Sequence, residues 1–465
     1  MPETSDDLTP STAYLDAMRR ATARRQRDAA RGAPGAAGPD GAYPGQESLW
    51  AAARARGEAL RPLLKKVALD LHAHPETAFE ERRSARLLVD ALAGHGAAAE
   101  LGAHGVETAF RSEYATPGYL PDRDPTVAVM AEYDALPEIG HACGHNVIAA
   151  AGLGAFLAAR DALAGAHRAA PSPAPRGRLV LLGTPAEEGH TGKEYLIRAG
   201  ALNGVDAAVM VHPFSYDIAE HAWVGRRTLD VTFSGVAAHA SSQPYMGRNA
   251  LDAASLAYQA IGLWRQEMPP SDRVHAIIEE GGTRPSVIPE RARMSIYVRS
   301  LLPDALRDLS RRVDDIVTGA ALMAGVRVER EWDRHPASLP VRNSGPLAAR
   351  WSATQRARGR DPLPAGVVPD ALAASTDFGN VSHLIPGLHP MVKVSPENVA
   401  LHTAEFAEYT NTDGAVDTAV DSAVGLAQVA IDYLGDEDLR EEAAAEFRAA
   451  GGPQRVAEIL GETES

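Results

Sequence analysis

Residues 126–150 read TVAVMAEYDALPEIGHACGHNVIAA, and the rest of the chain can be interpreted outward from this stretch. It begins with the apolar run TVAVMA, which predicts a buried strand, and it continues through a turn with Pro and Gly into an Ala-rich segment that predicts a helix. His141, Cys143 and His145 lie at this turn, so three residues of metal-binding type fall within five positions. Because ligands bind at the carboxyl ends of strands in open α/β sheets, the turn is a candidate site.

Composition and charge exclude several classes of protein. The 465 residues predict two or three domains. The net charge of −15 argues against a nucleic-acid partner, which would favour a basic surface. A single cysteine allows no intramolecular disulfide, and the acidic start MPETSDDLTP lacks the apolar core of a secretory signal. The sequence contains no run of about 18 apolar residues, so no membrane span is expected. We therefore expect a cytoplasmic protein without a membrane partner.

The first half of the chain predicts an α/β domain. Apolar strands are expected at 126–131, 178–183 and 207–213, and helical segments alternate with them. This alternation is typical of a mixed, largely parallel sheet covered by helices. After residue 346 the chain returns to this pattern, with a further strand expected at HPMVKVS, residues 389–395.

A second domain is expected to begin near Val224, where the sequence pattern changes. The segment 227–235 alternates apolar and polar residues, as a half-exposed strand does. A helix at 248–266, strands at 273–280 and 291–299, a helix at 303–324 and a strand at 326–333 follow. This β-α-β-β-α-β order predicts an inserted ferredoxin-like α+β domain. The predicted organisation is a flexible extension at 1–45, a catalytic domain at 46–224 and 341–435, a lid at 225–340 and a charged tail at 436–465.

Each apolar strand of the first domain is followed by residues that can bind metal. Glu187 and Glu188 follow RLVLLGTP, His212 ends AAVMV, and His402 lies late in the chain. Taken alone, each of these residues has a more ordinary interpretation. The histidines would be hydrogen-bonded, the glutamates would lie in a solvated acidic turn, and Cys143 would be a small buried hydrophobic residue. Together they favour a metal hydrolase, because imidazole, thiolate and carboxylate groups suit zinc, manganese, nickel or cobalt. A thiol nucleophile at Cys143 is the alternative.

Several longer stretches carry a resemblance to a known family. They are HPETAFEE, EYDALPEIGHACGHN, GTPAEEGHTGK, VHP, SGVAAHASSQPYMGRNALDA, SVIPERARMSIYVR, STDFGNVS and LHTAEF, and they run from about Leu71 to Glu408. In these stretches the chain resembles the M-twenty metallopeptidase family of aminoacylases, carboxypeptidases and amidohydrolases. The branch it is most similar to contains aminobenzoyl-glutamate hydrolases, indole-acetyl-amino-acid hydrolases and β-alanyl dipeptidases.

The resemblance implies a fold, an activity and an assembly. The fold is a metal-binding catalytic domain with an inserted lid that also forms a homodimer. The activity is hydrolysis of an amide bond in an N-acyl amino acid, a dipeptide or an aminobenzoyl-glutamate-like small molecule. The implied cofactor is one or two divalent ions, with zinc or manganese favoured over nickel or cobalt.

The resemblance also implies a role for individual residues. The implied metal ligands are Cys143, His145, Glu188, His212 and His402. Glu187 is the implied general base, and Asp134 is expected to orient a ligand, as carboxylates around metal sites commonly do. His239 is expected to reach the partner's active site and polarise the scissile carbonyl group. Asn249 and Arg299 are expected to hold the substrate or frame the site.

Two positions depart from the pattern of many relatives. Glu132 stands where relatives carry the His of an HxD motif, so its role toward a second metal is left open. Ser286 stands where relatives carry Asn, which predicts altered recognition of the substrate carboxylate. His141 is expected to support the site without binding metal. A hydrolytic deaminase of an aromatic amine and a non-catalytic binding protein of the same fold stay as alternatives.

Overall fold

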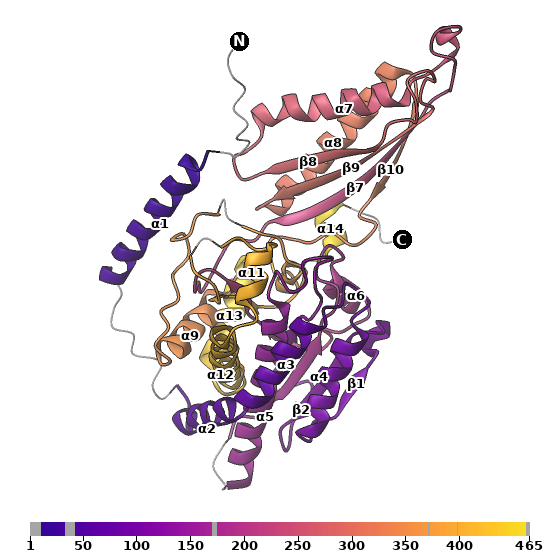
Figure 1. Ribbon diagram of the computed structural model, residues 1–465. Helices are drawn as coiled ribbons and strands as arrows, with labels where there is room; N and C mark the ends of the chain where they lie inside the picture. The colour runs from indigo at the N-terminus through magenta and orange to yellow at the C-terminus, as the bar shows by residue number, and fades with distance from the viewer. Residues whose placement is uncertain (1–10, 33–41, 170–173, 371–372, 398, 462–465) are drawn as a thin grey trace.

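The computed structural model describes residues 11–32, 42–169, 174–370, 373–397 and 399–461, and it shows a larger body with a smaller sheet-and-helix part above it (Figure 1). The body contains a six-stranded sheet with the order β1-β2-β4-β3-β5-β11. Its strands are β1 (Ala99–Leu101), β2 (Phe110–Ala115), β3 (Thr126–Ala131), β4 (Arg178–Gly183), β5 (Ala207–Val209) and β11 (Gly387–Leu388). The four strands β4, β3, β5 and β11 are parallel, whereas β1 and β2 pair antiparallel at one edge. The prediction of a mixed, largely parallel sheet is confirmed.

The apolar segment that follows the candidate ligand Cys143 forms the central helix of the body. This helix, α5 (His145–Ala169), packs against α12 (Asp413–Gly435), α2 (Gln46–Ala59) and α3 (Arg61–Ala73). By length and composition α5 could cross a membrane, but 83% of its most apolar window is buried inside the fold. Its apolar surface is therefore explained by packing in the core. Gly152 allows the close approach to β3, because a Cβ there would lie 2.9 Å from the carbonyl oxygen of Met130.

Shorter helices complete the body. They are α4 (Arg82–Gly94), α6 (Gly192–Arg198), α9 (Gly345–Arg356), α10 (Phe378–Ser382), α11 (Ala404–Tyr409) and α13 (Glu437–Ala449). Of these, α4, α9 and α13 pack on the face that α5 and α12 cover, whereas α6 and α10 lie on the other face. Leu196 of α6 and Phe378 of α10 join a second apolar cluster with Met130 and Leu182 of the sheet. Beyond β5 and β11, the strands β6 (His212–Phe214) and β12 (Met391–Lys393) form a separate parallel pair. The predicted strand at 207–213 is thus two short strands.

The smaller part is an antiparallel four-stranded sheet with the order β10-β7-β9-β8. Its elements are β7 (Gly225–Ser234), α7 (Ala250–Trp264), β8 (Arg273–Glu280), β9 (Arg291–Ser300), α8 (Pro303–Ala324) and β10 (Arg327–Trp332). The two helices lie together on one face, as Figure 1 shows, and share an apolar cluster with the strands. The predicted β-α-β-β-α-β order is confirmed, and we call this part the lid.

The two ends of the chain add helices outside these units. Helix α1 (Ala13–Gly32) forms part of the predicted N-terminal extension, and Arg25 donates a hydrogen bond to the carbonyl oxygen of Gly366. Near the C-terminus, α14 (Val456–Leu460) places Val456, Ile459 and Leu460 in the apolar cluster of the lid. Residues 1–10 and 33–41 of the extension and 462–465 of the tail lie outside the described residues. The domain boundaries themselves stay a prediction.

Candidate active site

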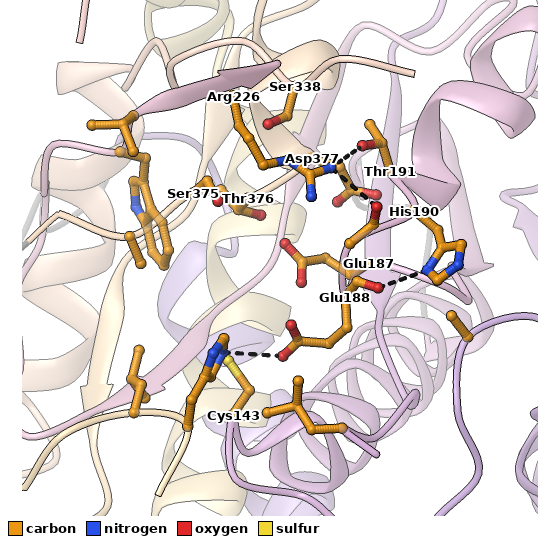
Figure 2. A pocket seen from close by; sticks show the side chains of 18 of the residues that line it. Cys143, Glu187, Glu188, His190, Thr191, Arg226, Ser338, Ser375, Thr376 and Asp377 are labelled. Carbon is orange, nitrogen blue, oxygen red and sulfur yellow. Dashed lines mark hydrogen bonds and ion pairs between the residues drawn. The ribbon is translucent and has the colours of Figure 1, made fainter. Parts of the chain in front are cut away.

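Most of the predicted site residues of the body line one cavity at the carboxyl edge of the sheet, and the buried His145 and Asp134 lie behind it. The cavity has a volume of about 790 Å³ and is lined by Cys143, Glu187, Glu188, His212 and His402 from the body, with Arg226 and Arg299 from the lid. Figure 2 shows Glu187 and Glu188 pointing into it, with Cys143 below them and Arg226 above them. Residues that are far apart in the sequence therefore form one site between the body and the lid.

The loop that carries Cys143 is pressed against the strand that carries His212. Gly144 has a left-handed φ of +81°, and a Cβ there would lie 2.7 Å from the ring of Pro213. Only glycine fits such a position without strain. The close approach brings the Cys143 Sγ to 3.5 Å from the His212 Nε2, and both side chains are buried. One thiol and one imidazole thus face each other at the base of the cavity.

Strained backbone conformations hold the two carboxylates and His402 in place. Ala186, immediately before Glu187, has a φ of +60°, and its N–H donates to Glu81 Oε1 at 2.8 Å. His402 also has a φ of +60°, and its N–H donates to the carbonyl oxygen of Ala142 at 2.9 Å. This places the His402 Nε2 at 3.3 Å from Glu188 Oε1. Left-handed backbone at residues other than glycine costs about 1–3 kcal/mol each, so surrounding contacts must hold it.

Asp134 orients His145 and also fixes Glu188. The Nδ1 of His145 lies 2.9 Å from Asp134 Oδ1, and the backbone N–H of Glu188 donates to Asp134 Oδ2 at 2.8 Å. Because Nδ1 donates to Asp134, the Nε2 of His145 is the nitrogen that faces the other carboxylates. Its distances are 3.5 Å to Glu132 Oε2, 3.9 Å to Glu187 Oε2 and 4.0 Å to Glu188 Oε1. Three carboxylates around one buried imidazole nitrogen favour a positive charge at this point, which an imidazolium or a bound cation can supply.

The donor geometry fits a metal ion. Two donors bound at 2.0–2.3 Å to one tetrahedral ion lie roughly 3.3–3.6 Å apart. Cys143 with His212, Glu188 with His402, and His145 with Glu132 have donor separations of 3.5, 3.3 and 3.5 Å. The buried atoms His145 Nε2, Glu188 Oε1 and Glu132 Oε2 also have no hydrogen-bond partner among the described residues. The three sets of candidate ligands are Cys143–His145–His212, Cys143–Glu188–His402 and His145–Glu187–Glu188.

Burial and neighbouring charges separate the two adjacent glutamates. Burial, followed by the negative charges of Glu188 and Glu132, raises the pKa of Glu187 well above its ordinary value of 4.5. Burial acts in the same direction on Glu188, but the close contact with His402, 3.3 Å from Glu188 Oε1, and the charge of His145 outweigh it and lower the pKa of Glu188. Glu187 therefore holds a proton more readily than an ordinary glutamate, as a general base should, while Glu188 favours the ionised form that can bind a cation.

A buried lysine, which the sequence analysis did not identify, lies beside the site. The Nζ of Lys193 donates to Glu132 Oε1 and, at 2.5 Å, to Asp377 Oδ1. The Lys193 side chain is almost fully buried, and its backbone N–H also donates to Asp377 Oδ2. Both residues lie in stretches that carry the family resemblance, GTPAEEGHTGK and STDFGNVS, but nothing local in the sequence shows that they meet. Glu132, whose role was left open, is thus held by Lys193 on one oxygen and faces His145 with the other.

Other predicted residues lie away from this centre. His239 is exposed on the lid and does not line the cavity of its own chain. Asn249 caps α7, with its Oδ1 accepting from the Leu251 N–H at 3.0 Å. His141 is buried beside His72, with ring centroids 6.3 Å apart, and belongs to none of the ligand sets among the described residues. The roles predicted for His239 and Asn249 stay predictions.

Comparison with known proteins identifies the family. Residues 224–322 match the model of the peptidase dimerisation domain. The chain is 35% identical to the Xaa-Arg dipeptidase of Homo sapiens over 384 residues, which cover 80% of this chain and 86% of the relative. The chain belongs to the M-twenty peptidase family. It is accordingly a metal-dependent hydrolase of amide bonds, and the match over the lid indicates a homodimer.

Further relatives and solved structures agree with this family. One of the p-aminobenzoyl-glutamate hydrolase chains of Escherichia coli K12 is 31% identical over 61% of each protein. The structure of an aminobenzoyl-glutamate utilization protein from Klebsiella pneumoniae matches with a TM-score of 0.61 at 22% identity, over 82% of this chain and 98% of that one. A dinuclear metal-binding peptidase of the same family from Bacillus subtilis matches with a TM-score of 0.58 at 21% identity, over 81% and 99%. These structural likenesses support the fold.

Proposed function

We propose that this M-twenty hydrolase cleaves the amide bond of an N-acyl amino acid, a dipeptide or an aminobenzoyl-glutamate-like small molecule. Its ligands are Cys143, His145, Glu188, His212 and His402, and Glu187 is the general base. The observation that carries the proposal is the unpartnered Nε2 of His145, which faces three carboxylates, among them that of Glu187, whose pKa is raised. This arrangement combines a cation site with a base at one point of the cavity.

The mechanism divides the chemistry between the metal and the chain. A divalent ion, when bound, lowers the pKa of a coordinated water and polarises the carbonyl group. Glu187 accepts the proton of the attacking water and returns it to the nitrogen of the leaving amine. Asp134 keeps the Nε2 of His145 directed toward the ligand cluster by its bond to Nδ1. Trp223, buried beside His212 with ring centroids 5.1 Å apart, helps to exclude water from that side.

His239 has the tautomer that its proposed role requires. Its Nδ1 lies 3.2 Å from the backbone N–H of Ser242 and 3.3 Å from that of Ser241, so Nδ1 accepts and the neutral ring carries its hydrogen on Nε2. An exposed Nε2–H can donate to a carbonyl oxygen. Because His239 does not line its own cavity, we propose that it serves the cavity of the partner subunit in a homodimer formed through the lid, where Asn249 helps to frame the site.

The substrate, metal and location are proposed from the relatives and the donor set. The relatives include a dipeptidase and an aminobenzoyl-glutamate hydrolase, which supports a small amide with an amino-acid part. Three imidazoles, one thiolate and one carboxylate favour zinc, with manganese next. One or two ions are compatible with these ligands. The single cysteine supports a cytoplasmic location.

The decisive experiment replaces the base and keeps the ligands. In Glu187→Gln, we expect the metal content of wild type and a turnover lower by several orders of magnitude on a panel of N-acyl amino acids, dipeptides and aminobenzoyl-glutamate. The exposed Glu441→Gln serves as the matched control and should retain full activity. A Glu187→Gln enzyme with a near wild-type rate would overturn the assignment. Release of ammonia in place of a carboxylic acid and an amine would identify a deaminase.

A mixing experiment tests the shared site. We expect His239→Ala to lower turnover strongly without changing metal content. Mixing His239→Ala with Glu187→Gln should restore activity, because a hybrid dimer contains one cavity with an intact Glu187 and an intact His239 from the other subunit. At random exchange of equal amounts, about half of the dimers are hybrids and each has one active cavity of two, as expected for two-fold dimers. No recovery after verified subunit exchange would place His239 outside the partner's site.

A further inference from the structure

A buried glutamate outside the ligand cluster contacts the loop that carries Glu187. Glu81 lies at the beginning of α4 and is 0% exposed, and its Oε1 accepts a hydrogen bond from the backbone N–H of Ala186 at 2.8 Å. Burial, followed by the negative charge of Asp134, raises the pKa of Glu81 to about 7. Burying a carboxyl group is unfavourable unless hydrogen bonds compensate it. The hydrogen bond that compensates Glu81 leads directly to the residue before Glu187.

The backbone that Glu81 contacts is strained. Ala186 is fully buried and has a φ of +60°, a left-handed conformation that residues other than glycine seldom adopt. Its N–H donates to Glu81, and its carbonyl oxygen accepts from the N–H of Gly192 at 2.9 Å. Without the carboxyl group, the Ala186 N–H would be buried and unpaired, and φ could relax to a negative value. Because rotation at Ala186 turns the chain that follows, the direction of Glu187 depends on this hydrogen bond.

The neighbouring ligand Glu188 is held by other contacts. Its backbone N–H donates to Asp134 Oδ2 at 2.8 Å, and its Oε1 lies 3.3 Å from the His402 Nε2. The carboxylate of Glu187 has no contact as close among the described residues, since its distance to the His145 Nε2 is 3.9 Å. The two adjacent glutamates are therefore positioned separately, Glu188 by its own bonds and Glu187 by the turn at Ala186.

We propose that Glu81 is a positioning residue for the base Glu187, and that it acts as a hydrogen-bond acceptor and not through its charge. This inference rests on the proposed amide-hydrolase function. The neutral and the ionised carboxyl group both offer an oxygen atom to the Ala186 N–H, so the hydrogen bond persists in either form. Misplacement of a reacting group by about 1 Å can lower a rate about 100-fold, so a small rotation at Ala186 is enough to matter.

Three substitutions of Glu81 separate its acceptor atom, its charge and its length. Glu81→Gln keeps an oxygen at the same place without the charge, Glu81→Asp keeps the charge on a shorter side chain, and Glu81→Met keeps neither. The metal-loaded dimer is assayed on the best substrate of the panel named above. We expect kcat within about threefold of wild type in Glu81→Gln, because the amide oxygen still accepts. In Glu81→Asp and Glu81→Met we expect kcat to fall about 100-fold with KM nearly unchanged.

Two outcomes of these assays would overturn the proposal. If Glu81→Gln loses as much activity as Glu81→Met, the charge of Glu81 is what matters. If Glu81→Asp has the wild-type rate, the hydrogen bond to Ala186 is not needed. Glu80→Met is the matched control, because Glu80 is the preceding residue but its side chain is 65% exposed. Its kcat should equal that of wild type, and a loss as large as in Glu81→Met would mean that any disturbance of this segment has the same effect.

Metal binding separates an effect on the base from an effect on the ligands. In Glu81→Asp and Glu81→Met we expect the metal content of wild type. After loading with cobalt(II) we expect the same visible absorption spectrum, because Glu188 keeps its hydrogen bond to Asp134. A metal content or a spectrum that changes together with kcat would show that Glu81 acts on the ligand cluster, which would contradict the proposal.

A combined variant tests whether Glu81 acts only through Glu187. The residual rate of Glu187→Gln should be the same with and without Glu81→Met, since residues that act as one unit have non-additive effects. A further loss in the combined variant would count against the proposal. If Glu187→Gln is inactive while Glu81→Asp and Glu81→Met are both active, only the positioning role is wrong. If Glu187→Gln keeps a near wild-type rate, the proposed function fails as well.

Discussion

Lys193 and the Arg226–Arg299 pair both lie beside the cavity, but only the charge of Lys193 is neutralised by carboxylates of the fold. Lys193 is buried between two carboxylates of its own chain, Glu132 and Asp377. Arg226 and Arg299 face each other in register without a carboxylate from the described residues. The charge that holds the metal side of the site together is therefore neutralised within the fold. The charge on the lid side has no carboxylate partner among the described residues.

Removing the charge of Lys193 should have the largest effect on the stability of the protein. In Lys193→Met, the carboxylates of Glu132 and Asp377 lose their shared cation while buried, and breaking a buried ion pair costs about 3–5 kcal/mol. We expect a clearly lower denaturation midpoint for the metal-free protein, measured by circular dichroism in urea. Adding Glu132→Gln to Lys193→Met should recover part of the loss, because one of the uncompensated charges is then removed.

The control for this prediction is an exposed lysine in an ion pair. Lys65 pairs with Asp413 at 2.6 Å, but the two side chains are 46% and 73% exposed. Surface ion pairs contribute about 0–1 kcal/mol, so Lys65→Met should leave the midpoint nearly unchanged. If Lys65→Met and Lys193→Met lower the midpoint by the same amount, burial is not what makes the Lys193 cluster important.

His383 represents a third state, a buried base kept neutral. Burial, followed by the charge of Arg342, lowers the pKa of His383 to about 4, and its Nε2 lies 3.0 Å from the carbonyl oxygen of Pro340. The unfolded chain titrates near 6.5, so it binds a proton between pH 6.5 and 4 while the folded protein does not. The stabilising effect of keeping His383 neutral is therefore present above pH 6.5 and is lost as the pH falls to 4. The loss is at most about 3 kcal/mol.

This pH dependence can be measured on the metal-free protein, where loss of metal in acid does not contribute. We expect the melting temperature of wild type to fall between pH 7 and pH 5, and the fall to be smaller in His383→Gln. His74→Gln is the control, since His74 is 53% exposed. An identical pH profile for His383→Gln and wild type would show that protonation of the folded state at this position has no unfavourable effect.

That the candidate metal ligands come together could be predicted from the sequence, because these residues follow strands directly. Cys143 and His145 come after β3, and Glu187 and Glu188 after β4, so parallel pairing of these strands is sufficient to bring them together. The order of elements in the lid was also predictable from alternating and helical periodicity. In both cases local pattern and tertiary position agree, which is when sequence reasoning succeeds.

Which buried charges have a partner could not be predicted from the sequence. The pairing depends on strand register and on contacts between segments that are far apart in the chain. Arg226 stands at the beginning of an alternating strand, where a polar residue is ordinary, and only the pairing of β7 with β9 places it opposite Arg299. Lys193 meets Asp377 through contact between α6 and α10, which are far apart in the chain. In the same way α14, which reads as part of a charged tail, packs into the apolar cluster of the lid.

Removing the charge of Arg299 should have the smallest effect on stability, and this effect should be stabilising. In Arg299→Met we expect an unchanged or slightly higher denaturation midpoint, because relief of a like-charge contact across the sheet contributes about 0.2–1 kcal/mol. Arg226→Met should be less favourable, since Thr191 Oγ1 loses a hydrogen bond. Urea denaturation of both variants beside Lys193→Met measures the contrast. If Arg299→Met destabilises the protein as much as Lys193→Met does, contacts of Arg299 within the fold outweigh the like-charge repulsion, and the contrast between the two regions is wrong.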